Sequence, residues 1–556
     1  MNAEDSLLVD NILRALNPLG RYQILHIIVV LLGLPIAGFQ LFSNVFTAKS
    51  VPHQCAGPPE GSNWTAVFDK SGNFTVVQEE CRLVLKENSS VLDSAPCVYG
   101  NEYELPRDAS VVSQFHLVCD IKWLASFSQT VLILGQGVGG FLSTIFSDRC
   151  GRKAAFVGSN FGFLLSGLAV AYSPNVIVFI VLKFFIGGFQ QGIGLSAAAY
   201  ILELLPLEYR AGQSWLVGGT WGFGVVMFSI VSSFFKHHSW RYLQLAISLA
   251  SVSAFLQWWY LDESLRWLLA NGKTKMATKI IRRMARVNGQ SDATVFEQLQ
   301  HAETFVRAEA KEQQKTSTEE FAIEATSRLS LLDILKVRRL LLNSVCLWFG
   351  WFTAAISFFT IYLTATSLSG DPYLNFGLTA LMEFPSNVFY FFYLNRLGRK
   401  RCMVTAYMTM GTGVVLAGMF KTLEKDNTMF TKFTLFASLV AMCGASGCFT
   451  IMFSYTPELF PTNLRTQAMG VSSFMGRIGG MLAPFASYLA EQAIWAPGVV
   501  IGICACLVCA LSHFLPETTG HELPQTLPEL HAWFKNKGAK DVNSRISSEV
   551  RNSRPV

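Results

Sequence analysis

Runs of about 20 apolar residues recur along this chain of 556 residues, and they constrain its fold more than any other feature. In a bilayer, helices and closed barrels alone satisfy every backbone polar group, and one such run matches one membrane-spanning helix. Charged residues make up 15% of the chain, against about 25% in soluble domains. The sequence therefore predicts an all-α membrane protein. We expect twelve spans, at roughly 22–47, 124–146, 154–172, 176–202, 213–235, 241–261, 340–366, 374–394, 402–420, 430–456, 466–490 and 497–515.

The long loop 48–123 indicates which side of the membrane is outside. It contains three N-glycosylation acceptors and four cysteines, namely Asn63, Asn73, Asn88, Cys55, Cys81, Cys97 and Cys119. Glycosylation and disulfides are typical of the extracellular side. We expect the cysteines to pair, and four cysteines allow three pairings.

Basic clusters in the loops on the other side agree with this orientation. They lie at 148–153, 282–286 and 395–401, as the positive-inside bias requires. The net charge of +6 is therefore a sign of membrane topology and does not indicate nucleic-acid binding. We expect a multi-pass plasma-membrane protein with a cytoplasmic N-terminus (1–21) and a cytoplasmic tail (516–556).

Three motifs repeat in the same order about 250 residues apart. Glu203-Leu-Leu-Pro with Arg210 returns as Glu458-Leu-Phe-Pro with Arg465, at an offset of 255 residues (458 − 203). The segment DRCGRK returns as NRLGRK, and LDESLRWLL returns loosely as LPETTGHEL. We infer two related halves of six spans each. The first half is 22–261, the cytoplasmic loop is 262–339, and the second half is 340–515.

Several motifs narrow this architecture to a family. They are Thr144-x-x-x-Asp148-Arg149-x-Gly151-Arg152-Lys153, PHQC at 52–55, VCDIKW at 118–123, SWRYLQLAISL at 239–249 and ELFPTNLR at 458–465. Together they resemble the organic cation, zwitterion and anion transporters, solute carrier family 22 of the major facilitator superfamily, and most closely its carnitine and organic cation carriers. The resemblance implies a twelve-helix fold of two six-helix halves in a pseudo-twofold arrangement, with substrate bound near the midplane.

Two ionisable residues lie deep in the second half. Arg477 and Glu383 are each about 18 Å from the cytoplasmic end of their span, although a charge there costs about 2.5 kcal/mol or more. They could form an ion pair, or either could face the substrate. The family resemblance favours substrate contact, because an acid plus an arginine suits a zwitterion with a quaternary ammonium and a carboxylate.

Aromatic and polar residues extend the predicted substrate site. On the family match these are Trp351, Phe352 and Phe358 in the seventh span and Gln244 in the sixth, although Gln244 could equally bond one helix to another. The repeated charges at the cytoplasmic helix ends are predicted to gate transport by breaking and remaking ion pairs. They are Asp148, Arg152, Glu203, Arg210, Glu458 and Arg465.

The sequence thus predicts a polyspecific carrier of small organic ions that works by alternating access. Carnitine-like zwitterions or cations are the leading substrates, organic anions are the alternative, and a non-transporting receptor or adaptor is the alternative of another class. No nucleophile–base pair, metal-ligand spacing or phosphate loop is recognisable, so we expect neither an enzyme nor a cofactor or metal. Coupling to Na⁺ or H⁺ stays open, as does self-association through the extracellular loop.

Overall fold

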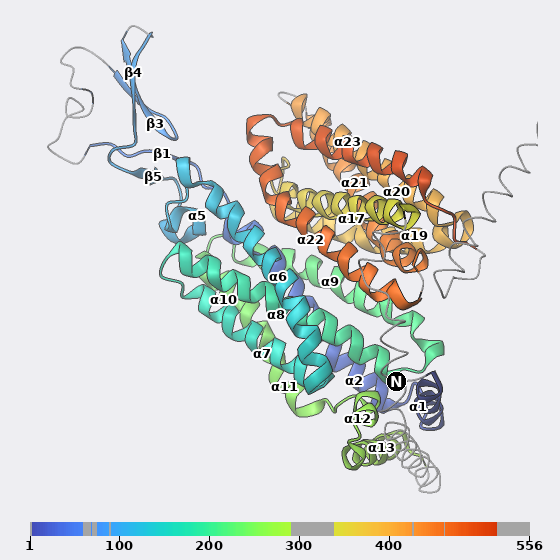
Figure 1. Ribbon diagram of the computed structural model, residues 1–556. Coiled ribbons are helices and arrows are strands. Elements are labelled where there is room, and N and C mark those ends of the chain that lie inside the picture. Colours follow the sequence, from blue (N-terminus) through green and yellow to red (C-terminus); the bar gives the residue numbers. More distant parts are fainter. Residues whose placement is uncertain are drawn as a thin grey trace, which may run out of the picture. The chain divides into compact units, whose positions relative to one another are not determined.

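The computed structural model describes residues 3–58, 68, 75–87, 90–290, 338–424, 428–460 and 462–519. The predicted glycosylation acceptors Asn63, Asn73 and Asn88 lie outside the described residues and stay predictions. Helices dominate the described part of the chain, as the apolar runs predicted (Figure 1).

Nine described helical segments are long and apolar enough to cross a membrane. The first is formed by α2 and α3, which meet at a short turn. The nine comprise α2 (Arg21–Leu31) with α3 (Leu34–Thr47), α6 (Trp123–Cys150), α7 (Arg152–Ala171), α8 (Val176–Leu204), α9 (Ala211–Phe234), α17 (Arg338–Ala365), α20 (Arg399–Thr422), α21 (Thr428–Glu458) and α23 (Ala496–Leu511).

The sixth, eighth and eleventh predicted spans are also helical, although two of them are interrupted. The sixth is built from α10 (Trp240–Leu249), the 3₁₀ turn η4 (Ala250–Val252) and α11 (Ser253–Tyr260). The eighth consists of α18 (Pro372–Leu381) and α19 (Glu383–Leu397), which meet at Met382. The eleventh is α22 (Thr462–Gln492), a single helix of 31 residues. Helical segments therefore occupy all twelve predicted spans within the part of the chain that the structure describes.

The chain forms two compact units. The first contains the described residues up to 290, together with 365–381 and 484–488, and the second contains the rest. The segment 365–381 groups with the first unit because α18 packs against α9, where the Ser229 hydroxyl donates a hydrogen bond to the Tyr373 carbonyl oxygen. The stacked rings of Phe46 and Tyr373, with centroids 4.6 Å apart, strengthen the same contact.

A small β structure lies at one end of the first unit, which we call the outer end (Figure 1). Strand β1 (His53–Cys55) pairs antiparallel with β5 (Asn101–Tyr103), and β2 (Thr75–Gln78), β3 (Arg82–Glu87) and β4 (Ser90–Pro96) form an antiparallel sheet. Two disulfides, Cys55–Cys97 and Cys81–Cys119, resolve the pairing that the sequence left open. Short helices η1 (Arg107–Ala109), α5 (Val111–Gln114) and η2 (Cys119–Ile121) lead into α6.

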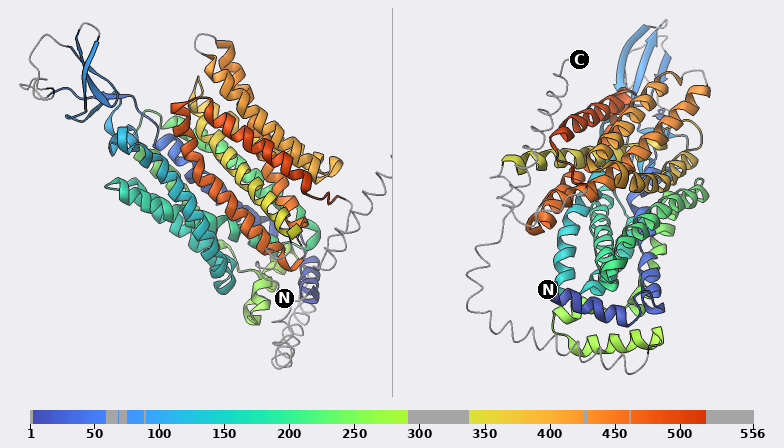
Figure 2. Two further views of the ribbon diagram at one scale, coloured as in Figure 1. Left: turned by 45° about the horizontal axis from the view of Figure 1, so that its top comes forward. Right: turned by 90° about the vertical axis from the view of Figure 1, so that its right-hand side faces the viewer.

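Amphipathic helices cover the opposite, inner end of the first unit (Figures 1 and 2). They are α1 (Ala3–Ala15), α12 (Leu265–Ala270) and α13 (Thr274–Asn288). The 3₁₀ turn η3 (Leu207–Tyr209) connects α8 to α9. Val9, Ile12 and Leu13 of α1 share one buried apolar cluster with Leu268 of α12 and Ile281 of α13. Helices α12 and α13 thus form the start of the segment 262–339 and pack against α1.

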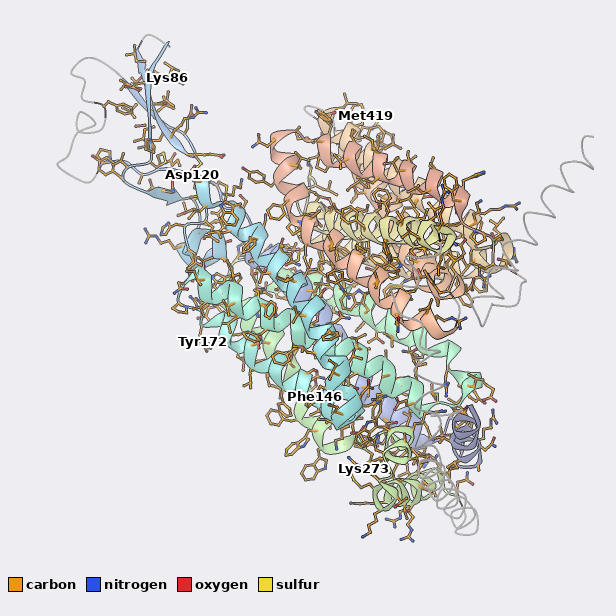
Figure 3. All side chains as sticks on the ribbon, viewed as in Figure 1. Lys86, Asp120, Phe146, Tyr172, Lys273 and Met419 are labelled. Atoms are coloured by element: carbon orange, nitrogen blue, oxygen red, sulfur yellow. A yellow bond between two sulfur atoms is a disulfide. The ribbon has the colours of Figure 1, made fainter. Side chains whose placement is uncertain are left out.

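Large apolar side chains also project outward from the spans, as a lipid-facing surface requires. Phe146 on α6 and Tyr172 after α7 are both exposed (Figure 3). Lys86 lies on β3 at the outer end of the first unit, and Lys273 lies just before α13 at the inner end, over the Trp267 ring (Figure 3).

A tight turn at Gly151 generates the first testable prediction. Gly151 has φ +106°, a conformation that strains residues with a side chain, and an added Cβ would lie 2.2 Å from Glu263 Oε2. We expect Gly151→Ala to lower the free energy of unfolding by about 1–3 kcal/mol. The measurement is the thermal midpoint of the purified protein. Gly137→Ala is the matched control, since no atom lies within 4 Å of its added Cβ; equal midpoints for both variants would contradict the prediction.

Candidate functional site

The inner end of the first unit is built around Arg152, the second residue after α6. Its Nε donates to Glu203 Oε1 at 2.8 Å, and its Nη1 donates to Asp148 Oδ1 at 2.8 Å and to the Ser147 carbonyl oxygen at 2.9 Å. The turn at Gly151 places the guanidinium between the ends of α6 and α8. Three of the predicted gating residues, Asp148, Arg152 and Glu203, thus form one ion-pair group.

The second unit repeats this group with an arginine that the sequence analysis did not single out. Arg399, at the start of α20, donates through Nε and Nη2 to Glu458 at distances of 3.0–3.2 Å. It corresponds to Arg152 in the DRCGRK repeat, at an offset of 247 residues (399 − 152). The repeat could have identified it, because each copy pairs the arginine after the turn glycine with the glutamate of the ELxP motif.

A carboxylate caps the helix after each turn. Glu263 Oε1 accepts from the Lys153 backbone N–H at 2.9 Å, and Glu517 accepts from the backbone N–H groups of Arg399 at 2.9 Å and Lys400 at 3.1 Å. The first helical N–H groups lack partners within a helix, so a carboxylate there satisfies them and complements the helix dipole. Burial opposes ionisation of Glu517, but hydrogen bonds from Thr519 and these amides outweigh it and hold its pKa below the ordinary value.

The remaining predicted gating arginines contact groups within their own units. Arg210 Nη2 lies 3.4 Å from Asp10 Oδ1, and Arg266 forms a shorter ion pair with the same carboxylate. In the second unit Arg465 Nε donates to the Pro457 carbonyl oxygen at 2.8 Å. Asp10 was missed from the sequence because it lies in a terminal helix outside the repeat, yet it fastens α1 to the inner end.

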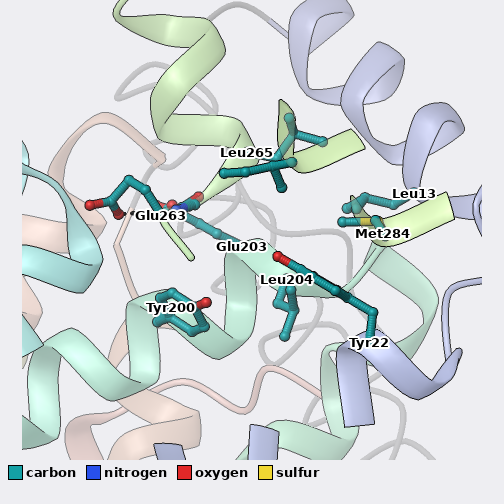
Figure 4. A pocket seen from close by; sticks show the side chains of 10 residues that line it. Leu13, Tyr22, Tyr200, Glu203, Leu204, Glu263, Leu265 and Met284 are labelled. Atoms are coloured by element: carbon teal, nitrogen blue, oxygen red, sulfur yellow. Dashed lines mark hydrogen bonds between the residues drawn. The ribbon is translucent and has the colours of Figure 1, made fainter. Parts of the chain in front are cut away.

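A small pocket lies beside Glu203 at this inner end (Figure 4). Its lining combines the phenols of Tyr22 and Tyr200 with apolar side chains of α1 and α13, including Leu13 and Met284. Glu203 Oε2 is buried and has no hydrogen-bond partner among the described residues.

The predicted acid of the second unit lies where α18 ends and α19 begins. Glu383 is the first residue of α19, is 5% exposed, and accepts a hydrogen bond from the Tyr362 hydroxyl. It takes part in no ion pair among the described residues. The hydrogen-bond partner of Glu383 is thus a phenol, and its ion pair with Arg477 stays a prediction. The bond between Tyr362 and Glu383 could not be predicted from the sequence, because only the fold brings the two residues together.

Aromatic rings surround this acid–phenol pair within the second unit. Phe358 packs against Tyr362 and against Phe449 of α21, with centroids 5.1 and 5.2 Å apart. Trp351 is buried, and its indole N–H donates to Thr456 Oγ1 at 3.0 Å. The structure thus brings Glu383, Phe358 and Trp351 into one wall formed by α17, α19 and α21. Phe449 was missed because a lone phenylalanine in an apolar span carries no signal of its own.

Arg477 lies at the midpoint of α22 and is half-buried. The glycines on either side of it bring α22 close to α17. An added Cβ at Gly476 would lie 3.3 Å from the Trp351 ring, and one at Gly479 would lie 2.3 Å from the Phe352 carbonyl oxygen. Phe352 itself is half-buried and stacks on Phe349. The depth predicted for Arg477 is consistent with this place in the helix.

Gln244 belongs to the first unit, where it is fully buried on α10. Its amide nitrogen donates to Gln40 Oε1 at 3.0 Å and lies 3.3 Å from the Gly167 carbonyl oxygen and from Ser248 Oγ. These bonds join α3, α7 and α10, which is the helix-to-helix role that the sequence held equally open.

Comparison with known proteins extends this picture. A family model described as sugar (and other) transporter matches residues 84–528. Organic anion transporter 3 of Pongo abelii is 30% identical over 532 residues, covering 94% of this chain and 93% of that protein. The human protein of the same name is 29% identical over 539 residues, covering 94% and 93%. Solute carrier family 22 member 6-B of Xenopus laevis is 29% identical over 566 residues, covering 97% of both.

Solved structures agree with the predicted fold. The inward-open xylose transporter XylE from E. coli matches with a TM-score of 0.57 at 14% identity, covering 92% of this chain and 99% of that one. Its partially occluded inward-open form matches with the same TM-score at 15% identity, covering 94% and 100%. Such low identity is evidence for the fold alone, and it confirms the major facilitator architecture.

The helix cap at Glu517 generates the second prediction. Glu517→Gln keeps the shape but removes the charge, so we expect the free energy of unfolding to fall by about 1–2 kcal/mol at pH 7. Because the folded pKa is below the unfolded value, the carboxylate's contribution is complete above about pH 4.5 and is lost as pH falls through the folded pKa. Thermal midpoints of variant and wild type should therefore differ from pH 5 to 8 and converge as the pH falls through the folded pKa.

Glu208→Gln is the control for this series. Glu208 is exposed and pairs with Arg14 on the surface, where an ion pair contributes little. Its substitution should leave the midpoint unchanged at every pH. A constant offset for Glu517→Gln down to pH 3 would contradict the charged cap.

Proposed function

Because this chain belongs to the sugar (and other) transporter family and, within it, to solute carrier family 22 of the major facilitator superfamily, we propose that it carries small organic anions across the plasma membrane. The expected preference for carnitine-like zwitterions or cations finds no support among the relatives described above, two of which are named organic anion transporter 3. The anion alternative agrees with those names better. Alternating access between two six-helix halves is the proposed mechanism.

The observation that carries this proposal is the arginine at the midpoint of α22. A guanidinium presents parallel N–H donors that match a carboxylate, and the bond gains strength where water is excluded. Gly476 and Gly479 hold α22 against α17, so the Arg477 backbone is fixed beside the aromatic residues of that helix. A cation held at this depth favours a substrate with negative charge and an apolar body.

Glu383 supports an anion carrier rather than a cation carrier through its hydrogen bond. The Tyr362 hydroxyl donates to its carboxylate, and both groups are buried. This acid is thus occupied by a neutral phenol inside the protein. We assign to Trp351, Phe352 and Phe358 the role of an aromatic wall for the apolar part of the substrate, and to Gln244 a structural role.

The ion pairs of Arg152 and Arg399 support a second part of the mechanism. Arg152–Glu203 and Arg399–Glu458 each lie within one unit, and the capping carboxylates lie beside them. We assign them the role of fixing three helix ends to one another in each half. Each half then moves as one body, with its ion pairs intact, while access alternates.

Uptake in cells that express the chain tests the proposed function. The panel is labelled 4-aminobenzoate, carnitine and tetraethylammonium, each with and without Na⁺, normalised to protein at the cell surface. We expect saturable uptake of 4-aminobenzoate alone. Arg477→Met should lower its clearance at low concentration about 10- to 100-fold, which corresponds to loss of one charge-assisted hydrogen-bonded contact.

Glu383→Gln is the matched variant, since it removes the other deep charge. Carboxylate uptake should survive it, because its partner is a phenol and the amide can still accept that hydrogen bond. Saturable carnitine uptake that needs both Glu383 and Arg477 would contradict the anion proposal and support zwitterions as the substrates. Surface expression with no saturable uptake of any probe would instead favour a receptor.

A further inference from the structure

A second buried cation lies in the first unit, in a span where the sequence analysis noted none. Lys183 is the eighth residue of α8, about 10 Å along the helix from its outer end. Its side chain is fully buried, with 0% exposure. An ionisable group inside a membrane span is costly, and such groups usually take part in substrate or ion recognition.

The neighbours of the Lys183 ammonium are neutral. Nζ donates to Ser43 Oγ of α3 at 2.7 Å, and Ser43 in turn donates to the Gln40 carbonyl oxygen at 2.8 Å. The Phe179 ring lies below Nζ, with its centroid 5.2 Å away. Among the described residues Lys183 makes no ion pair with a carboxylate. One hydroxyl and one ring therefore surround a group with three N–H donors.

The apolar side of this position is formed by rings at the outer end of the unit. Phe179 packs edge to face on Trp240 with centroids 5.8 Å apart, and Phe115 packs on Trp240 at 6.4 Å. The Trp240 indole N–H donates to Gln114 of α5, which anchors the ring. On the polar side of this position, Gln40 Nε2 donates a 3.0 Å hydrogen bond to Ser248 Oγ.

This combination fits an anion with an apolar portion better than it fits a purely structural lysine. A buried ion pair is stable when both charges are present, and removing one partner leaves an uncompensated charge that is strongly unfavourable. A bound anion would supply the missing partner and use the free N–H donors, while the rings would accommodate an aryl or alkyl group. Ser43 and Phe179 already orient the amine.

We propose that Lys183, Ser43 and Phe179 form an anion-binding subsite within the first half, which takes the carboxylate of an organic anion. This inference rests on the proposed function for the identity of its ligand, although it concerns a different half from Arg477. The same ammonium chemistry would also hold an inorganic anion such as chloride. The experiment therefore separates the two sources.

Binding is measured first, on the purified full chain, as the shift of the thermal midpoint with ligand. The probes are 4-aminobenzoate in chloride-free gluconate buffer, and chloride alone. We expect 4-aminobenzoate to raise the thermal midpoint of the wild type. Most of that shift should be lost in Lys183→Met, and Lys183→Arg should show an intermediate shift. A chloride shift that disappears in Lys183→Met would identify chloride as the occupant and keep the subsite.

Transport supplies the second readout. In cells, Lys183→Met should raise the KM for 4-aminobenzoate about 10-fold or more at matched surface expression. Lys236→Met is the control, because Lys236 is an exposed lysine beyond the outer end of α9, and it should leave KM unchanged.

The outcomes separate the two proposals. Wild-type protein that shows Lys183-dependent anion shifts but no uptake would overturn the transport function and keep the subsite. Uptake with an unchanged KM in Lys183→Met, together with anion shifts equal to those of the wild type, would overturn the subsite and leave the proposed function intact. If Lys183→Met does not fold, Ser43→Ala takes its place, and an unchanged KM and shift there would also overturn the subsite.

Discussion

The turn between two membrane helices, closed by an arginine and a carboxylate, is the constraint on which the rest of this structure depends. At Gly151 and again at Gly398 the chain reverses with positive φ, and a distant glutamate caps the helix that follows. The neighbouring arginine then reaches the end of a third helix through Glu203 or Glu458. Spans far apart in sequence are thereby joined at their ends, where lipid provides no hydrophobic force to hold them together.

The architecture could be predicted because its signals are redundant. Twelve apolar runs, the duplicated motifs and the basic loops agree with one another, and helices do occupy all twelve predicted spans in the described part of the chain. The turn η4 could not be predicted, since such an interruption depends on packing. The strands between Cys55 and Tyr103 were also missed, because that loop was assessed only for its cysteines and glycosylation acceptors.

The candidate site also contains residues that the sequence predicts and residues that it does not. Arg477, Glu383 and the acids predicted to gate transport could be singled out from the sequence because charge in or beside an apolar span is conspicuous. Their partners were harder to predict, since Tyr362, Asp10 and Arg399 acquire a role only through contacts with residues far along the chain. Lys183 was overlooked although it is as conspicuous as Arg477, because it lies outside the repeated motifs. The proposal that the substrates are anions rests on Arg477 together with the names of the relatives.

The disulfide-linked strands at the outer end have a further consequence for how motion could be observed. Cys81–Cys119 fastens β3 to the turn that starts α6, and the Ser110 hydroxyl reaches back to the Lys49 carbonyl oxygen after α3. Both ends of the β structure are therefore attached to helices of a single unit. A fluorophore or antibody fragment placed on these strands would travel with the first half alone. It would serve as a fixed reference mark against which displacement of the second half could be recorded.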